Sequence, residues 1–220
     1  MSSRMLVGNH VEHNARRFAR KVAVRVAHGP EWTYRELNSF ANRAAHALRA
    51  AGIGRGDKVG LLCDSRLEWV GLYVGIVKLG AVAVPVNYRL TSREIAEHLA
   101  DSDARLLLAL ESMFVPLHDA IPGLRTVLID GTTEDGLDAF LQGQPDGDID
   151  AQVHASDPNV ILFTGGTTGR SKGVVLTHEN LFWNSLDEII DTHMHEGDNT
   201  LLVTPLHHSA ALNCWLLPHL

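Results

Sequence analysis

One segment of the 220-residue sequence gathers the residue types that bind phosphate groups. Residues 161–176 form an apolar run, a loop of glycines and hydroxyl side chains with one lysine, and a second apolar run. Glycines let a backbone turn tightly, and successive N–H groups in such a loop form a concavity for an anion. The alternative is a purely structural glycine-rich turn, but loops that follow strands in open sheets commonly hold ligands. The candidate binding residues are Thr164, Gly165, Gly166, Thr167, Thr168, Gly169, Ser171 and Lys172.

The spacing differs from that of the P-loop, in which Gly-Lys-Ser/Thr follows four spacer residues. Lys172 stands three residues after Gly169, and Gly173 follows it. The segment instead resembles the signature loop of the class I adenylate-forming enzymes, which include acyl-CoA synthetases, luciferases and adenylation domains of peptide synthetases. Gly165 stands where this family usually has Ser or Thr, and Ser171 where it usually has Pro. The matching residues are Phe163, Thr164, Gly166, Thr167, Thr168, Gly169, Lys172 and Gly173.

Three further segments extend the resemblance over nearly the whole chain, from about Trp32 onward. Residues 78–87 are similar to the core segment that precedes the loop in this family. The sequence Asn-Tyr-Arg-Leu at 87–90 resembles the acyl-CoA synthetases, with fatty-acyl-CoA synthetases as the closest group, more than the peptide synthetases. Residues 204–208 resemble the segment that lines the acyl end of the site, where His208 matches the family histidine and His207 replaces an aromatic residue.

The resemblance implies an acid–thiol ligase that uses ATP, Mg²⁺ and coenzyme A. A small-molecule carboxylic acid, most simply a fatty acid, would attack the α-phosphate of ATP, and coenzyme A would then accept the acyl group from the adenylate. Residues 164–172 would hold the β- and γ-phosphates, and His208 would stand near the acyl-adenylate carbonyl as the catalytic candidate. A merely packed histidine is the alternative for His208. A helix that starts near Ser209 and includes Trp215 would line the acyl pocket, with simple core packing as the alternative for Trp215. The family places its adenylation lysine in a later domain, so residues 1–220 alone are expected to have little ligase activity.

Three other functions stay open at this point. The protein could be an adenylation domain that loads a carrier protein, or a truncated, non-catalytic relative that serves as an interaction module. A metal-dependent hydrolase is a third alternative, because His is a common metal ligand and several histidines cluster near the end of the sequence. Their spacing matches no zinc-protease motif, so we assign no metal-ligating residues. The cluster is His193, His195, Asp198, His207 and His208.

Composition excludes some partners. The formal net charge of −7 gives no general attraction to nucleic acid or to an anionic membrane. Cys63 and Cys214 have no short pairing pattern and are expected to be free thiols. No signal peptide is visible, and the most apolar region, residues 69–86, is interrupted by Lys78 and by glycines. We therefore expect a cytoplasmic protein without a membrane span, and the oligomeric state stays open.

The glycine-rich loop at residues 164–172 depends on the helices and strands around it for its position. Apolar spacing predicts a helix over 37–48, preceded by the capping pair Thr33 and Glu36, and a second helix over 67–79. A third helix is predicted after the capping pair Thr91 and Glu94. This alternation with strands predicts an α/β fold with mostly parallel sheets flanked by helices. The resemblance implies that this fold is the incomplete N-terminal part of the large domain of an adenylate-forming enzyme. We expect a first subdomain at 1–141, a surface connection at 142–158 and the start of a second subdomain at 159–220. The predicted strands are 59–63, 81–86, 105–110, 125–129, 159–163 and 200–203, and a further strand follows the loop and ends near Leu176.

Overall fold

The computed structural model describes residues 5–165 and 171–220. Its central six-stranded sheet has the order β6-β5-β3-β4-β7-β8, in which every neighbouring pair is parallel except the antiparallel pair β7 and β8. This sheet confirms the predicted α/β class with a mostly parallel sheet. The strands are β3 (Lys58–Leu62), β4 (Val82–Pro85), β5 (Ala104–Ala109), β6 (Arg125–Leu128), β7 (Pro158–Thr164) and β8 (Lys172–Thr177), and a separate hairpin is formed by β1 (Val22–Arg25) and β2 (Glu31–Thr33).

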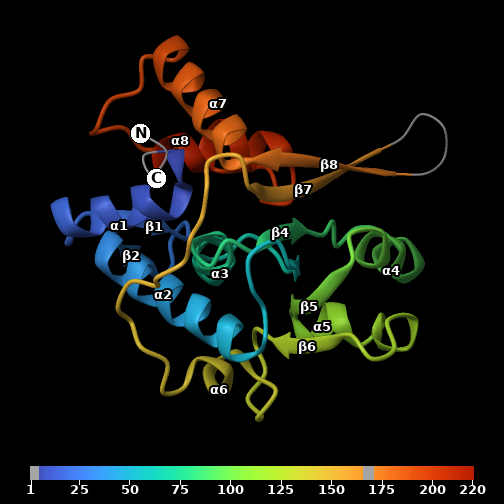
Figure 1. Ribbon diagram of the computed structural model, residues 1–220. Coiled ribbons are helices and arrows are strands. Elements are labelled where there is room, and N and C mark those ends of the chain that lie inside the picture. Colours follow the sequence, from blue (N-terminus) through green and yellow to red (C-terminus); the bar gives the residue numbers. More distant parts are fainter. Residues whose placement is uncertain (1–4, 166–170) are drawn as a thin grey trace.

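Helices cover both faces of this sheet (Figure 1). One face packs mainly on α2 and α3, and the other packs on α4, because side chains alternate between faces along each strand. On β5, for example, Leu106 and Leu108 belong to the α2–α3 core, while Leu107 joins the core beneath α4. The helices are α1 (Val7–Arg17), α2 (Tyr34–Ala50), α3 (Leu67–Lys78), α4 (Ser92–Asp101), α5 (Glu111–Phe114), α6 (Leu137–Leu141), α7 (His178–Asp191) and α8 (Leu217–His219), with a 3₁₀ turn η2 (His118–Ala120) and a π-helix η3 (Ala210–Leu216).

Local sequence sets where the helices begin. Thr33 caps α2 and Thr91 caps α4, each in a reciprocal capping box with the glutamate three residues later, as predicted. Thr177 forms a third box with Asn180 at the start of α7, which the sequence reading missed because the usual Glu is replaced by Asn. These boxes supply partners for backbone N–H groups that the first turn of a helix leaves unpaired.

The connection before β7 is tied to the first half of the chain. Arg55 donates two hydrogen bonds to the Asp157 carboxylate, at 2.7 and 2.6 Å, and Asn42 donates to the backbone carbonyl of Asp146 at 2.7 Å. β7 then pairs in parallel with β4, with Ala83 opposite Val160. Residues from both predicted subdomains thus share one sheet, while the proposed division at 142–158 stays a prediction.

The predicted strand over residues 200–203 is wrong. This segment is irregular, and Leu201 and Val203 are 74% and 82% exposed. An apolar run becomes a strand only where a neighbouring strand pairs with its backbone, and no described strand lies beside this one. Elsewhere, both cysteines are free thiols, Cys63 being buried. No helix within 5–165 or 171–220 is long and apolar enough to cross a membrane.

Candidate active site

The predicted phosphate loop joins β7 to β8 at the carboxyl edge of the parallel sheet. The two strands pair up to their ends, with Phe163 opposite Gly173 and Thr164 opposite Lys172. Because β7 runs parallel to β4, its last residue Thr164 points out of the same edge as the segment that follows β4. This edge is where ligands bind in open α/β sheets. Figure 1 shows the hairpin extending beyond the body of the sheet.

The two ends of the loop are closed by hydroxyl groups. Ser171 donates its hydroxyl proton to the backbone carbonyl of Thr164, and Thr164 Oγ1 donates to the carbonyl of Lys172 at 3.4 Å. Lys172 itself is exposed, and it forms no ion pair with a described residue. A Cβ at Gly165 would meet no atom of a described residue within 4 Å, so on that side a ligand has room to approach the backbone. The predicted contacts Gly166, Thr167, Thr168 and Gly169 lie outside the described residues.

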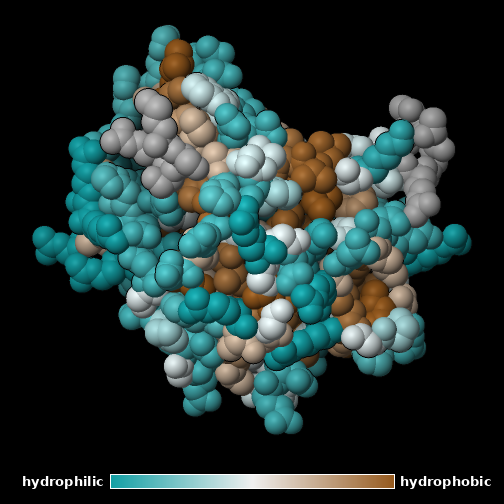
Figure 2. All heavy atoms as spheres, in the orientation of Figure 1, coloured by the Kyte–Doolittle hydropathy of each residue, from teal (hydrophilic) through white to brown (hydrophobic). Residues whose placement is uncertain are grey.

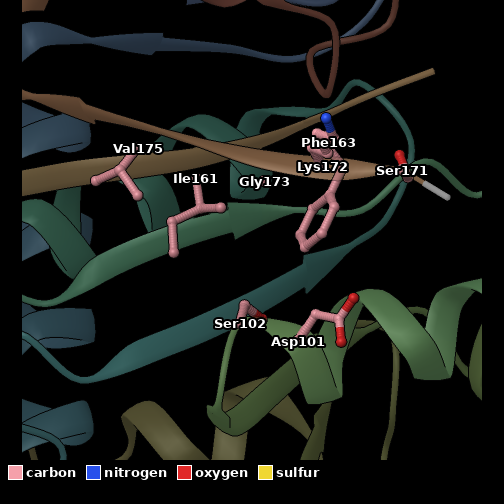
Figure 3. Close-up of a pocket in the computed structure, with 8 residues that line it drawn as sticks. All are labelled: Asp101, Ser102, Ile161, Phe163, Ser171, Lys172, Gly173 and Val175. Carbon is pink, nitrogen blue, oxygen red and sulfur yellow. The ribbon is translucent and has the colours of Figure 1, made fainter. Parts of the chain in front are cut away.

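A cavity of about 390 Å³ lies between the hairpin and the end of α4 (Figure 3). Its apolar wall comes from alternating hairpin residues, and Lys172 and Ser171 line its loop end. The Phe163 ring points from β7 into this cavity, toward Asp101 and Ser102 (Figure 3). The cavity is lined by Asp101, Ser102, Ile161, Phe163, Ser171, Lys172, Gly173 and Val175.

The histidine pair predicted near the acyl group lies at the same edge of the sheet. The Leu206 N–H donates to Ser65 Oγ at 3.2 Å, and the His207 ring meets the Tyr88 ring edge-on at 5.1 Å. Ser65 follows β3 and Tyr88 follows β4, so residues 206–208 lie over the ends of two adjacent strands, and β7 is the next strand along. The structure therefore brings His208 and the phosphate loop to neighbouring strand ends.

The two histidines differ in environment. His208 is exposed, as a ligand contact requires, and its ring lies 4.4 Å from that of His207. His207 is buried, and neither of its ring nitrogens has a hydrogen-bond partner among the described residues. Burial, with smaller contributions from His208 and Arg89, lowers the pKa of His207 to about 4. The substitution of histidine for an aromatic residue thus preserves ring packing but leaves two polar atoms unpaired.

The segment after His208 is helical, as predicted, but in an unusual form. Residues Ala210–Leu216 form the π-helix η3. π-Helical turns are rare and are frequently found at functional sites. Trp215, a candidate lining residue of an acyl pocket, is 43% exposed.

The histidine cluster near the end of the sequence bears on metal ligation by the protein's own side chains. Among the described residues, no three His, Cys, Asp or Glu side chains are placed to hold an ion. His195 and Asp198 instead form a turn, in which the Asp198 carboxylate accepts the His195 backbone N–H at 2.7 Å.

Comparison with known proteins gives one family. The family described as AMP-binding enzyme matches residues 11–220. The long-chain-fatty-acid–CoA ligase FadD13 of Mycobacterium tuberculosis is 36% identical over 186 residues, which cover 82% of this chain and 36% of that protein. The feruloyl-CoA synthase of an Amycolatopsis species is 34% identical over 200 residues, which cover 90% of this chain and 39% of that enzyme.

Solved structures agree with this result. An inhibitor-bound N-terminal domain of FACL13 from Mycobacterium tuberculosis superposes with a TM-score of 0.87 at 30% identity, over all of this chain and 55% of that one. The chain thus spans less than two fifths of the two curated ligases and about half of the solved domain. The family match covers the hairpin, the histidine pair and the whole central sheet that carries them, and the chain therefore belongs to the family of AMP-binding enzymes.

Proposed function

We propose that the protein activates a carboxylic acid, most simply a fatty acid, as its acyl-adenylate with ATP and transfers the acyl group to coenzyme A. The observation that supports this proposal most directly is the position of the β7–β8 loop. The loop follows β7, which lies next to β4 in the sheet. The segment that follows β4 carries Tyr88, whose ring contacts His207. Phosphate groups and an acyl carboxylate could therefore meet at one edge.

The residues of this chain would act mainly by positioning. A carboxylate is a poor acyl donor until its oxygen bears a leaving group, and formation of the mixed anhydride requires in-line attack on the α-phosphate. Lys172 supplies an exposed cation at the loop end, and the open approach at Gly165 brings phosphate oxygens near backbone N–H groups. Ser171 holds the loop closed through Thr164, rather than presenting its proton to the ligand.

Mg²⁺ fits this proposal as a companion of the nucleotide. The described residues offer a cation and hydroxyls at the loop but no three-ligand metal site, a set that suits an ion held largely by phosphate oxygens and water. Bound there, Mg²⁺ would neutralise negative charge on the phosphates. His208 would then form the exposed wall beside the acyl carbonyl, and the thiol of coenzyme A would approach that carbonyl after pyrophosphate has left.

The test is carboxylate-dependent exchange between ATP and pyrophosphate, measured with the full-length protein that the gene encodes. The panel holds short, medium and long-chain fatty acids and aromatic acids, and thioester formation is followed with and without coenzyme A. Exchange with one class of acid together with a coenzyme-A-dependent thioester is the expected result, and that class names the substrate. Exchange without a thioester would move the acceptor to a carrier protein. Absence of exchange with every acid, in a folded protein, would refute the proposal.

A further inference from the structure

The tip of the hairpin is held by one aromatic contact from outside it. The His98 ring on α4 stacks on the Phe163 ring of β7, with centroids 4.0 Å apart and planes inclined by 7°. Phe163 is the last apolar residue before the loop, two positions before Gly165. β8 offers little support on the other side, since Val174 and Val175 are 43% and 52% exposed, and Figure 2 shows an apolar area at the surface where the hairpin lies.

The helix that carries His98 is itself fixed. The Thr91–Glu94 capping box closes its first turn, and Leu99 packs so closely on β3 that a Cβ at Gly60 would stand 2.7 Å from its Cδ2. His98 is buried, and burial lowers its pKa, which favours the neutral ring that packs parallel to the Phe163 ring. A rigid helix thus presents a planar ring to the residue from which the loop emerges.

From this geometry we infer that His98 is a positioning residue for nucleotide binding. It fixes the Phe163 ring, and through the Phe163 backbone it fixes Thr164, whose carbonyl accepts the Ser171 hydroxyl at the other end of the loop. The inference rests on the proposed function for its nucleotide. It predicts that loss of the His98 ring loosens the hairpin at Phe163 and Thr164 and weakens ATP binding, with little effect on binding of the acid.

The experiment uses three variants of the uninterrupted gene product. His98→Ala removes the ring, His98→Phe keeps a stacking ring without the nitrogens, and Thr91→Ala is the matched control, which weakens the same helix without touching the hairpin. KM for ATP and KM for the acid are measured by pyrophosphate exchange. Cleavage by trypsin after Lys172 is followed by mass spectrometry, because it reports loosening of the hairpin in the absence of any substrate.

We expect His98→Ala to raise KM for ATP roughly threefold to tenfold, the range that loss of an aromatic pair produces, and to speed cleavage after Lys172 by a similar factor. The KM for the acid should change by less than roughly twofold. His98→Phe should restore both the KM for ATP and the rate of cleavage after Lys172. The inference is overturned if His98→Ala behaves like Thr91→Ala, or if His98→Phe is as impaired as His98→Ala. Failure of the proposed function is distinguishable: exchange is then absent in the wild type too, and cleavage after Lys172 alone decides whether His98 anchors the loop.

Discussion

A chain of buried hydrogen bonds at the base of the hairpin is expected to make the stability of the protein depend on pH. The Tyr73 hydroxyl donates to Asn159 Oδ1 at 2.6 Å, and Asn159 Nδ2 donates to His178 Nδ1 at 3.0 Å. As an acceptor, Nδ1 must be unprotonated, and the His178 side chain has no exposed surface. Burial therefore lowers the pKa of His178 from 6.5 to about 4, although the Asp157 carboxylate opposes this shift.

The sign and size of the effect follow from proton linkage. Between pH 6.5 and 4 the unfolded chain binds a proton at residue 178 that the folded chain does not bind. The free energy of unfolding therefore falls as the pH falls through this window, and His178 contributes nothing to the pH dependence above it. A depression of this size corresponds to a loss of about 3 kcal/mol by pH 4, a large part of the stability of an ordinary domain.

The assay is urea denaturation at several pH values from 7.5 to about 4.5. His178→Gln keeps an acceptor for Asn159 but cannot titrate, so the wild type should lose stability relative to this variant as the pH falls. The exposed residue His195 provides a matched control, because His195→Gln measures the same substitution at the surface. If the stabilities of the wild type and His178→Gln fall in parallel over the whole window, the reasoning is wrong.

Three further predictions concern packing and the loop. His207→Phe should raise the free energy of unfolding by about 1–2 kcal/mol in urea denaturation at pH 7, because it removes two unpaired buried nitrogens and keeps the ring; a less stable variant would contradict this. Gly75→Ala should lower the free energy of unfolding by about 1–3 kcal/mol, because the new Cβ would stand 2.8 Å from the Ala41 carbonyl oxygen. Gly147→Ala is the control and should leave the stability unchanged, because a Cβ at Gly147 would meet no described atom within 4 Å. Lys172→Ala should lower kcat/KM for ATP in pyrophosphate exchange by roughly tenfold to a hundredfold, and Lys172→Arg should recover part of this loss. A wild-type kcat/KM in Lys172→Ala would show that Lys172 does not contact the nucleotide.

The sequence predicted most of the sheet because its strands are buried in a parallel arrangement. Such strands form continuous apolar runs, and β3, β4, β5 and β6 each lie within two residues of the predicted ranges. The same rule failed at residues 200–203, because an apolar run records hydrophobicity but not whether a neighbouring strand is present. The Thr91–Glu94 and Thr33–Glu36 boxes succeeded because a cap depends only on residues within one turn.

The candidate site was predictable only where its residues are close in sequence. Thr164, Ser171 and Lys172 lie in one motif, and the structure places them together at the hairpin end. The stack of His98 on Phe163 joins residues 65 positions apart on different elements, and nothing in the spacing of either residue indicates it. Its signal in the sequence is weak: a histidine in place of an aliphatic residue on the inner face of a predicted helix.

The hairpin is thus fixed at two points, by a hydrogen bond at its base and by a ring stack at its tip. We expect the first contact to affect the stability of the protein and the second to affect ATP binding. At its base, Asn159 is the second residue of β7 and His178 follows β8, so their hydrogen bond joins the two strands where they leave the core. At its tip, the His98–Phe163 stack holds the strand from which the loop emerges. A change at the base exposes core and should act on unfolding, whereas a change at the tip leaves the core intact and should act on ATP binding. Combining His178→Gln with His98→Ala should therefore give additive effects on each readout, since coupling requires shared contacts and these two pairs share none that is described.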